Sequence, residues 1–97
     1  MILFIHINRY YYSKESQNAE RIPSNIQINE EIAVAQNTFR FKGAILHFDS
    51  RNSGHYQTLI RNEDGYYLYN DSSIEEIKHM DFEDFDENYD VLLYQKI

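Results

Sequence analysis

His55 stands between Gly54 and Tyr56 at the start of a run of strand-forming residues, and fifteen positions later the chain reads Asn70-Asp71. A side-chain oxygen that accepts a hydrogen bond from one imidazole nitrogen fixes the tautomer and leaves the other nitrogen free to act as a base. Such a pair is the base and orienting half of a nucleophilic triad. These residue types therefore indicate general-base chemistry at His55, with Asn70 or Asp71 as its partner.

A β-hairpin would bring these side chains together. Residues 56–61 and 66–69 are rich in β-branched and aromatic residues, and Asn62-Glu63-Asp64-Gly65 separates them. Asp-Gly supplies the positive φ that a tight hairpin turn needs. If the two segments pair across this turn, Asn70 or Asp71 lies beside the His55 ring. The geometry alone is a modest signal, because hairpin ends often collect Asn and Asp.

The elements around this hairpin are also predominantly β. Strands are expected over residues 2–7, 39–48, 54–61, 66–69 and 89–95, with 10–12 extending the first, and shorter ones over 26–28 and 74–77. Residues 13–20 and 49–53 are expected to be loops, and helical turns are predicted over 30–35 and 80–86. The fold class is therefore α+β and predominantly antiparallel β, with hairpin connections. The 97 residues allow a single domain, 1–97.

Charge is unevenly distributed along the chain. Residues 1–61 carry seven basic and five acidic groups, whereas residues 62–97 carry two basic and eleven acidic groups. Phosphate repulsion makes nucleic acid a poor partner for such a chain, so none is expected. The acidic half is either a solvated face or a surface that meets a basic partner.

Other classes of protein are disfavoured by composition. The mean hydropathy is −0.66 and apolar runs are short, so neither a membrane span nor a membrane partner is expected. The four histidines lack a metal-ligand spacing, and we expect neither a metal site nor another cofactor. There is no cysteine. An intracellular location, in cytoplasm or nucleus, is the default expectation.

Several stretches in the right order resemble one family, the ubiquitin-specific proteases. Gly54-His55-Tyr56, Thr58-Leu59-Ile60 and the run from Tyr67 to Ile74 look like the family's histidine box, and residues 50–53 resemble the small polar loop before it. Further stretches that resemble the family are Leu3 to Tyr10, Arg21 to Ile26, Phe39 to His47 and Tyr89 to Lys96. The resemblance covers nearly the whole chain. It corresponds, however, only to the last third or so of the family's catalytic domain.

The resemblance implies a fold and a set of roles. The fold would be the β-rich palm half of a papain-like cysteine peptidase. His55 would be the general base that activates a thiol, Asn70 the orienting residue, and Asp71 an acid that supports or replaces it. Gly54 would leave room for a substrate that ends in two glycines, and Tyr56 would line that channel. His47 would be structural.

The family's cysteine box has no counterpart here, so the chain alone cannot carry out the family's reaction. One hypothesis is that it is the C-terminal part of a deubiquitinating cysteine protease, and that another segment or polypeptide supplies the nucleophile. Its partners would be a ubiquitin-like C-terminal tail and the polypeptide that completes the domain. The alternative is a catalytically inactive module that binds protein or serves as a structural component of a larger assembly. A virus particle is one such assembly, since the Ile, Asn and Tyr content hints at an AT-rich genome.

Overall fold

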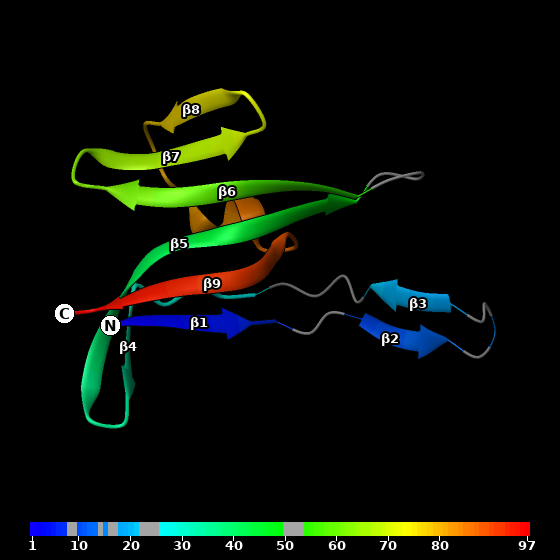
Figure 1. Ribbon diagram of the computed structural model, residues 1–97, viewed down its shortest axis with the longest axis horizontal. Coiled ribbons are helices and arrows are strands. Elements are labelled where there is room, and N and C mark those ends of the chain that lie inside the picture. Colours follow the sequence, from blue (N-terminus) through cyan, green and yellow to red (C-terminus); the bar gives the residue numbers. More distant parts are fainter. Residues whose placement is uncertain (8–9, 14, 16–17, 22–25, 50–53) are drawn as a thin grey trace.

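The computed structural model describes the chain except residues 8–9, 14, 16–17, 22–25 and 50–53 (Figure 1). The backbone alone is described for residues 10–13, 18–21 and 49. The described residues form nine strands and one 3-10 helix, η1. Their bounds are β1 (Ile2–His6), β2 (Tyr10–Ser13), β3 (Asn18–Arg21), β4 (Glu31–Val34), β5 (Asn37–Asp49), β6 (Gly54–Asn62), β7 (Gly65–Asn70), β8 (Ser73–Ile77), η1 (Phe82–Phe85) and β9 (Tyr89–Lys96).

Seven of these strands build one antiparallel sheet in the order β1-β9-β5-β6-β7-β8, with β4 paired to the N-terminal part of β5 (Figure 1). The long strand β5 is central because it pairs with β4, β6 and β9. β2 and β3 pair with each other in a separate two-stranded sheet. The antiparallel class expected from the sequence is confirmed. The strands expected over 89–95, 39–48, 54–61 and 66–69 are present as β9, β5, β6 and β7, which are neighbours in this order.

The hairpin of β6 and β7 turns where the sequence predicts. Asn62 pairs with Gly65, which leaves Glu63 and Asp64 as a two-residue loop. The φ of Gly65 is 141°, a conformation that residues with a Cβ rarely adopt. The glycine therefore lets the chain enter β7 directly after the loop.

The segments before β5 differ from the sequence-based expectation. The helical turn predicted over residues 30–35 is wrong, since β4 occupies Glu31–Val34 and pairs with residues 37–40 of β5. The turn between them places Ala35 at a φ of 50° and Gln36 at 70°. The strand predicted over 26–28 is also wrong, because residues 26–29 have no regular secondary structure.

The N-terminal elements differ as well. Residues 10–13 form a strand separate from β1 and pair with residues 18–21. The loop expected over 13–20 is therefore wrong at residue 13 and at residues 18–20, which lie in these strands. The loop expected over 49–53 lies, apart from Asp49 at the end of β5, outside the described residues. The short strand expected over 74–77 and the helical turn expected over 80–86 are confirmed as β8 and η1.

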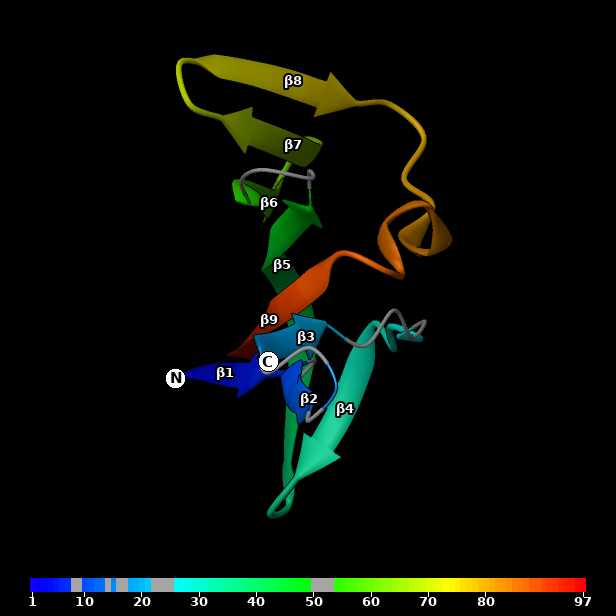
Figure 2. The ribbon, with the colours of Figure 1, turned by 90° about the vertical axis from the view of Figure 1, so that its right-hand side faces the viewer.

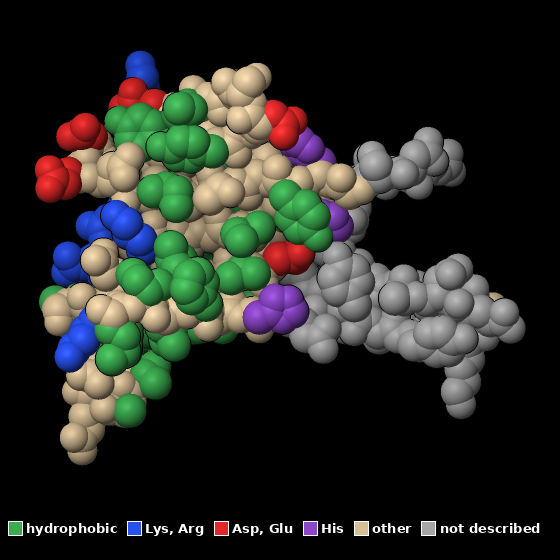
Figure 3. Space-filling view, viewed as in Figure 1, with side chains coloured by type: hydrophobic (Ala, Val, Ile, Leu, Met, Phe, Trp, Pro, Cys, Tyr) green, Lys and Arg blue, Asp and Glu red, His purple; other side chains and the backbone are tan. Residues whose placement is uncertain are grey.

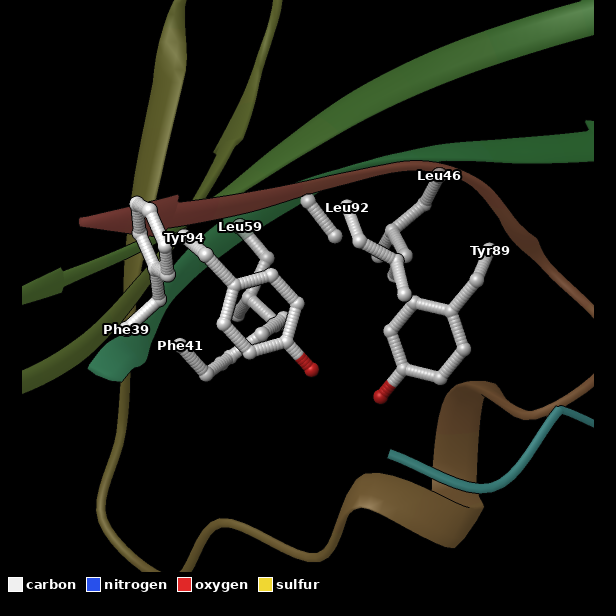
Figure 4. Packing of buried hydrophobic residues seen from close by; sticks show 8 residues of the cluster. Phe39, Phe41, Leu46, Leu59, Tyr89, Leu92 and Tyr94 are labelled. Atoms are coloured by element: carbon white, nitrogen blue, oxygen red, sulfur yellow. The ribbon is translucent and has the colours of Figure 1, made fainter. Parts of the chain in front are cut away.

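One face of the sheet carries the core. Its fully buried side chains include Phe41, Leu46, Leu59, Tyr89 and Tyr94, and Figure 4 shows the two tyrosine rings extending from β9 on the side where η1 lies. The Tyr89 hydroxyl donates to the carbonyl oxygen of Phe82 at 2.8 Å. The Tyr94 hydroxyl donates to that of Asn29 at 2.7 Å. These bonds tie η1 and the segment before β4 to the sheet, because a buried hydroxyl needs a partner.

The opposite face is not covered by η1 (Figure 2). The strand registers align two rows of side chains across it. One row is Val91, Ile45, Thr58, Tyr69 and Ile74, and the other includes Phe4, Leu93, Ile60 and Tyr67. We call these residues the open face. Apolar side chains gather over this side of the sheet in Figure 3. Among them, Phe4 is 68% exposed and Ile45 is 38% exposed.

Leu59 lies on the face of the sheet opposite to Ile45 and Tyr67. Leu59 pairs with Ala44, one position before Ile45, and successive side chains of a strand point to opposite faces. Leu59 is fully buried in the core.

We expect the protein to lose stability at alkaline pH because two of its tyrosines are buried. Burial, followed by the nearby Asp86 carboxylate, raises the pKa of Tyr89 well above its ordinary value of 10.0. Burial likewise raises the pKa of Tyr94. Above pH 10 the unfolded chain therefore binds fewer protons than the folded chain, so the free energy of unfolding falls as pH rises. Each tyrosine contributes at most about one proton to this slope.

Urea unfolding of the chain and of a Tyr89→Phe variant between pH 8 and 11 measures the effect. The variant should lose about 0.5–1.5 kcal/mol at pH 8 with its hydrogen bond, and should show a shallower decline above pH 10. Equal slopes for the two proteins would contradict the assignment to Tyr89.

Candidate active site

The β6–β7 register brings His55 and Asn70 together. Thr58 pairs with Tyr69, so Gln57 lies opposite Asn70, and His55 is two positions further along the same face of β6. Diagonal neighbours of this kind are within reach of a long or aromatic side chain. The Nε2 atom of His55 lies 2.7 Å from Oδ1 of Asn70. The contact predicted from the hairpin is therefore present.

This contact determines which imidazole nitrogen is available for chemistry. Because Oδ1 of an amide can only accept, Nε2 of His55 carries the hydrogen and donates it. Nδ1 is then the nitrogen with the lone pair. His55 is half-buried at the start of β6, and Asn70 is half-buried at the end of β7. When the imidazole is neutral, the contact holds it in one tautomer, with Nδ1 able to accept the proton of a thiol or hydroxyl.

Asp71 follows Asn70 directly but lies in a different environment. It is exposed and begins the two-residue turn before β8, with a φ of 48°. The hydroxyl of Ser73 donates to the carbonyl oxygen of Asn70 at 3.0 Å and closes this turn. Of the two candidate partners, the structure thus brings Asn70 to the imidazole. A supporting role for Asp71 stays a prediction.

Gly54 and Tyr56 flank His55 and lie on the opposite face of β6. Tyr56 is 57% exposed. Its ring stacks on that of His47 in β5, with a centroid separation of 4.6 Å and an interplanar angle of 29°. The resemblance implied a structural role for His47, and no signal in the sequence linked it to the site. In the β5–β6 register Phe48 pairs with His55, and His47 therefore lies directly opposite Tyr56.

One cavity lined by basic side chains lies away from this site. It has a volume of about 450 Å³ and is lined in part by Arg40, Lys42, Arg61 and Lys96. Arg61 is six positions from His55 along β6, or about 20 Å. Among the described residues, no group of three or more His, Cys, Asp or Glu side chains could hold a metal ion. No helix in the described part of the chain is long and apolar enough to cross a membrane.

Comparison with known proteins relates this sheet and its site to one family. The family model described as ubiquitin carboxyl-terminal hydrolase matches residues 1–94. No curated protein matches the chain.

Solved structures share the fold. One is the SAGA Ubp8/Sgf11/Sus1/Sgf73 DUB module bound to ubiquitin aldehyde, with a TM-score of 0.81, 17% identity, and coverage of 99% of this chain and 24% of that chain. The yeast SAGA DUB module with a variant Sgf73 gives a TM-score of 0.79, 18% identity, and coverage of 99% and 23%. The chain thus spans about a quarter of the length of these solved chains. A family match over residues 1–94, together with this fold, places the chain in the ubiquitin carboxyl-terminal hydrolase family, as a C-terminal palm portion without a cysteine.

Proposed function

We propose that this chain supplies the general base and its orienting amide to a deubiquitinating active site whose cysteine lies outside these 97 residues. The observation that carries the proposal is the 2.7 Å contact between Nε2 of His55 and Oδ1 of Asn70 on a sheet of this family's fold. The contact leaves Nδ1 of His55 as the proton acceptor.

The reaction assigns a step to each group. Nδ1 of His55 takes the proton from a cysteine thiol, and the thiolate attacks the carbonyl carbon at the C-terminus of ubiquitin. The imidazolium then returns this proton to the departing amine, leaving a thioester that water hydrolyses. Asn70 keeps the ring in position throughout, because its oxygen accepts from Nε2 in both charge states.

The substrate would be the C-terminal tail of ubiquitin or of a ubiquitin-like protein. One matched structure is a SAGA DUB module bound to ubiquitin aldehyde. In this chain the backbone of Gly54 and the exposed Tyr56, which flank His55 in β6, would border the tail. The eleven acidic groups of residues 62–97 favour a basic tail as a weaker second contact. The working location would be intracellular, in cytoplasm or nucleus, where ubiquitin substrates occur.

The open face supports a second polypeptide segment as partner. Contiguous exposed apolar surface on a folded protein marks an interaction site. The matched solved chains are about four times longer than this chain, so most of their fold has no counterpart here. We propose that a second polypeptide segment or another component of a larger assembly covers this face. The cysteine itself would lie on the other side of the sheet, because His55 extends from the same face of β6 as Leu59.

The second candidate is a catalytically inactive module that binds protein, for instance in a virus particle. The absence of any cysteine from the chain favours it. A ubiquitin probe with a thiol-reactive electrophile at its C-terminus separates the two functions, because only an activated cysteine reacts with it.

We expect a complex isolated through a tag on this chain to contain a polypeptide that the probe labels, while the isolated 97-residue chain remains unlabelled. A probe without the two terminal glycines is the matched control and should not react. A complex in which nothing is labelled would overturn the catalytic proposal and leave the binding module.

A further inference from the structure

The backbone at Gly54 lies unusually close to the side chain of His47. A Cβ added at Gly54 would be 2.3 Å from Nε2 of His47, and 3.3 Å from two further atoms of the same ring. Nonbonded heavy atoms sit at about 3.5–4.0 Å when their contact is favourable. The imidazole therefore occupies the space that any other residue at position 54 would need. This packing is a reason for glycine at position 54 that does not involve substrate.

The His47 ring is itself held in place. It is only 6% exposed. The backbone N–H of His47 donates to the backbone carbonyl oxygen of Asn88 at 2.8 Å. The side-chain Nδ2 of Asn88 donates to the backbone carbonyl oxygen of His47 at 3.1 Å. These two bonds fasten this part of β5 to the residue that precedes β9. The backbone of His47 is thus fixed, and burial leaves its ring less room to move than the end of an exposed side chain has.

His47 contacts the residues on both sides of His55. It lies against Gly54 and stacks on Tyr56, whereas the His55 ring extends from the other face of β6 toward Asn70. We propose that His47 is a positioning residue: its ring fixes the first three residues of β6, and thereby the direction of His55 and the orientation of Tyr56. What the positioned groups do rests on the proposed function, but the positioning itself does not.

A double-mutant cycle in the 97-residue chain tests the contact. Gly54→Ala alone should lower the folding equilibrium constant by about tenfold or more, because its methyl group collides with the fixed ring. His47→Ala removes the ring, so the same methyl group should then fit. The combined losses should fall short of additive by about tenfold. If Gly54→Ala does not fold, a folded double variant supports the proposal, and an unfolded double variant beside a folded His47→Ala overturns it.

Gly43 provides the matched control. A Cβ added there would lie 2.2 Å from the backbone oxygen of Leu59, which no side-chain truncation can remove. Gly43→Ala and His47→Ala should therefore be additive. Coupling as strong as that of the Gly54 pair would show a general weakening of the sheet and would overturn the specific contact.

The positioning role is tested by nitrogen NMR of the imidazoles. In the unsubstituted chain His55 should be the tautomer with hydrogen on Nε2, and in His47→Ala both tautomers should be populated. A His55 signal that is unchanged in a folded His47→Ala chain would overturn the proposal, as would a His47→Ala chain that fails to fold, since His47 would then serve stability alone. If the Nε2–H tautomer were absent from the unsubstituted chain, the proposed role of His55 as the base would be contradicted, whatever the double-mutant cycle shows.

Discussion

Replacing His55 by alanine in the complete catalytic unit, this chain together with the segment that supplies the cysteine, is expected to lower kcat/KM for a ubiquitin C-terminal reporter by about 10²–10⁴-fold. That range is typical for the loss of a general base. Without Nδ1 to accept its proton, a thiol attacks mainly through the small fraction that is ionised at neutral pH. The deficit should therefore shrink as pH rises toward the thiol's own pKa, about 8.5 for a free cysteine.

Two companion variants make this result interpretable. Asn70→Ala should cost less, about 100-fold, because the base remains but its ring is no longer held in the productive direction. His79→Ala replaces an exposed histidine outside the hairpin and should leave the rate unchanged. Rates that fall equally in the His55 and His79 variants, with the fold intact by circular dichroism, would remove His55 from the reaction.

The second large effect concerns the core. Phe41→Ala is expected to reduce the free energy of unfolding by about 3–5 kcal/mol, as large-to-small changes at buried aromatic residues do. Phe41 is 1% exposed, and its ring packs edge-on against Phe82 of η1 and Tyr94 of β9, with centroids 5.3 and 5.6 Å away. It therefore joins β5 to two elements that lie about 40 residues or more further along the chain. Domains of this size are stable by only about 5–15 kcal/mol, so the variant should be partly unfolded at 37 °C.

Phe4→Ala is the control for residue type. Phe4 is 68% exposed on the open face, so its loss from the isolated chain should cost less than about 0.5 kcal/mol. Urea unfolding followed by circular dichroism compares the two variants. Similar losses would contradict the placement of the core on the η1 side. In a complex that covers the open face, Phe4→Ala should weaken association instead.

The pairing that the sequence predicted best is the one between β6 and β7, which adjoin in the chain. The alternation in residues 39–48 and 54–61 and the Asp64-Gly65 turn are local signals, and the β6–β7 pairing follows from them. The position of Asn70 beside His55 is a direct result of this register. For the same reason the hydrogen-bond partner of His55 could be narrowed to Asn70 or Asp71 without any knowledge of the rest of the fold.

The segments that the sequence predicted poorly carry no local signal for the partner that they take. Residues 30–35 contain no strong β signal, and they form β4 because the N-terminal part of β5 offers a free edge. Ile26 and Ile28 alternate as a strand would, yet the N–H of Ile26 bonds to the carbonyl oxygen of Asp86 rather than to a strand. The contact between His47 and Gly54 could not be predicted from the sequence, because a histidine near the end of a strand gives no local sign of what its ring touches.

The two-residue loop of the β6–β7 hairpin limits the insertions and deletions that this segment can accept during evolution. His55 and Asn70 are held on one face by the number of residues on each side of Glu63 and Asp64, and not by the identity of the side chains between them. A single residue inserted between Gly65 and Asn70 would turn the amide to the other face, since side chains alternate along a strand. Substitutions at the exposed positions of the same strands leave the geometry untouched. Homologous sequences should therefore tolerate wide variation in composition here while conserving the length of each arm.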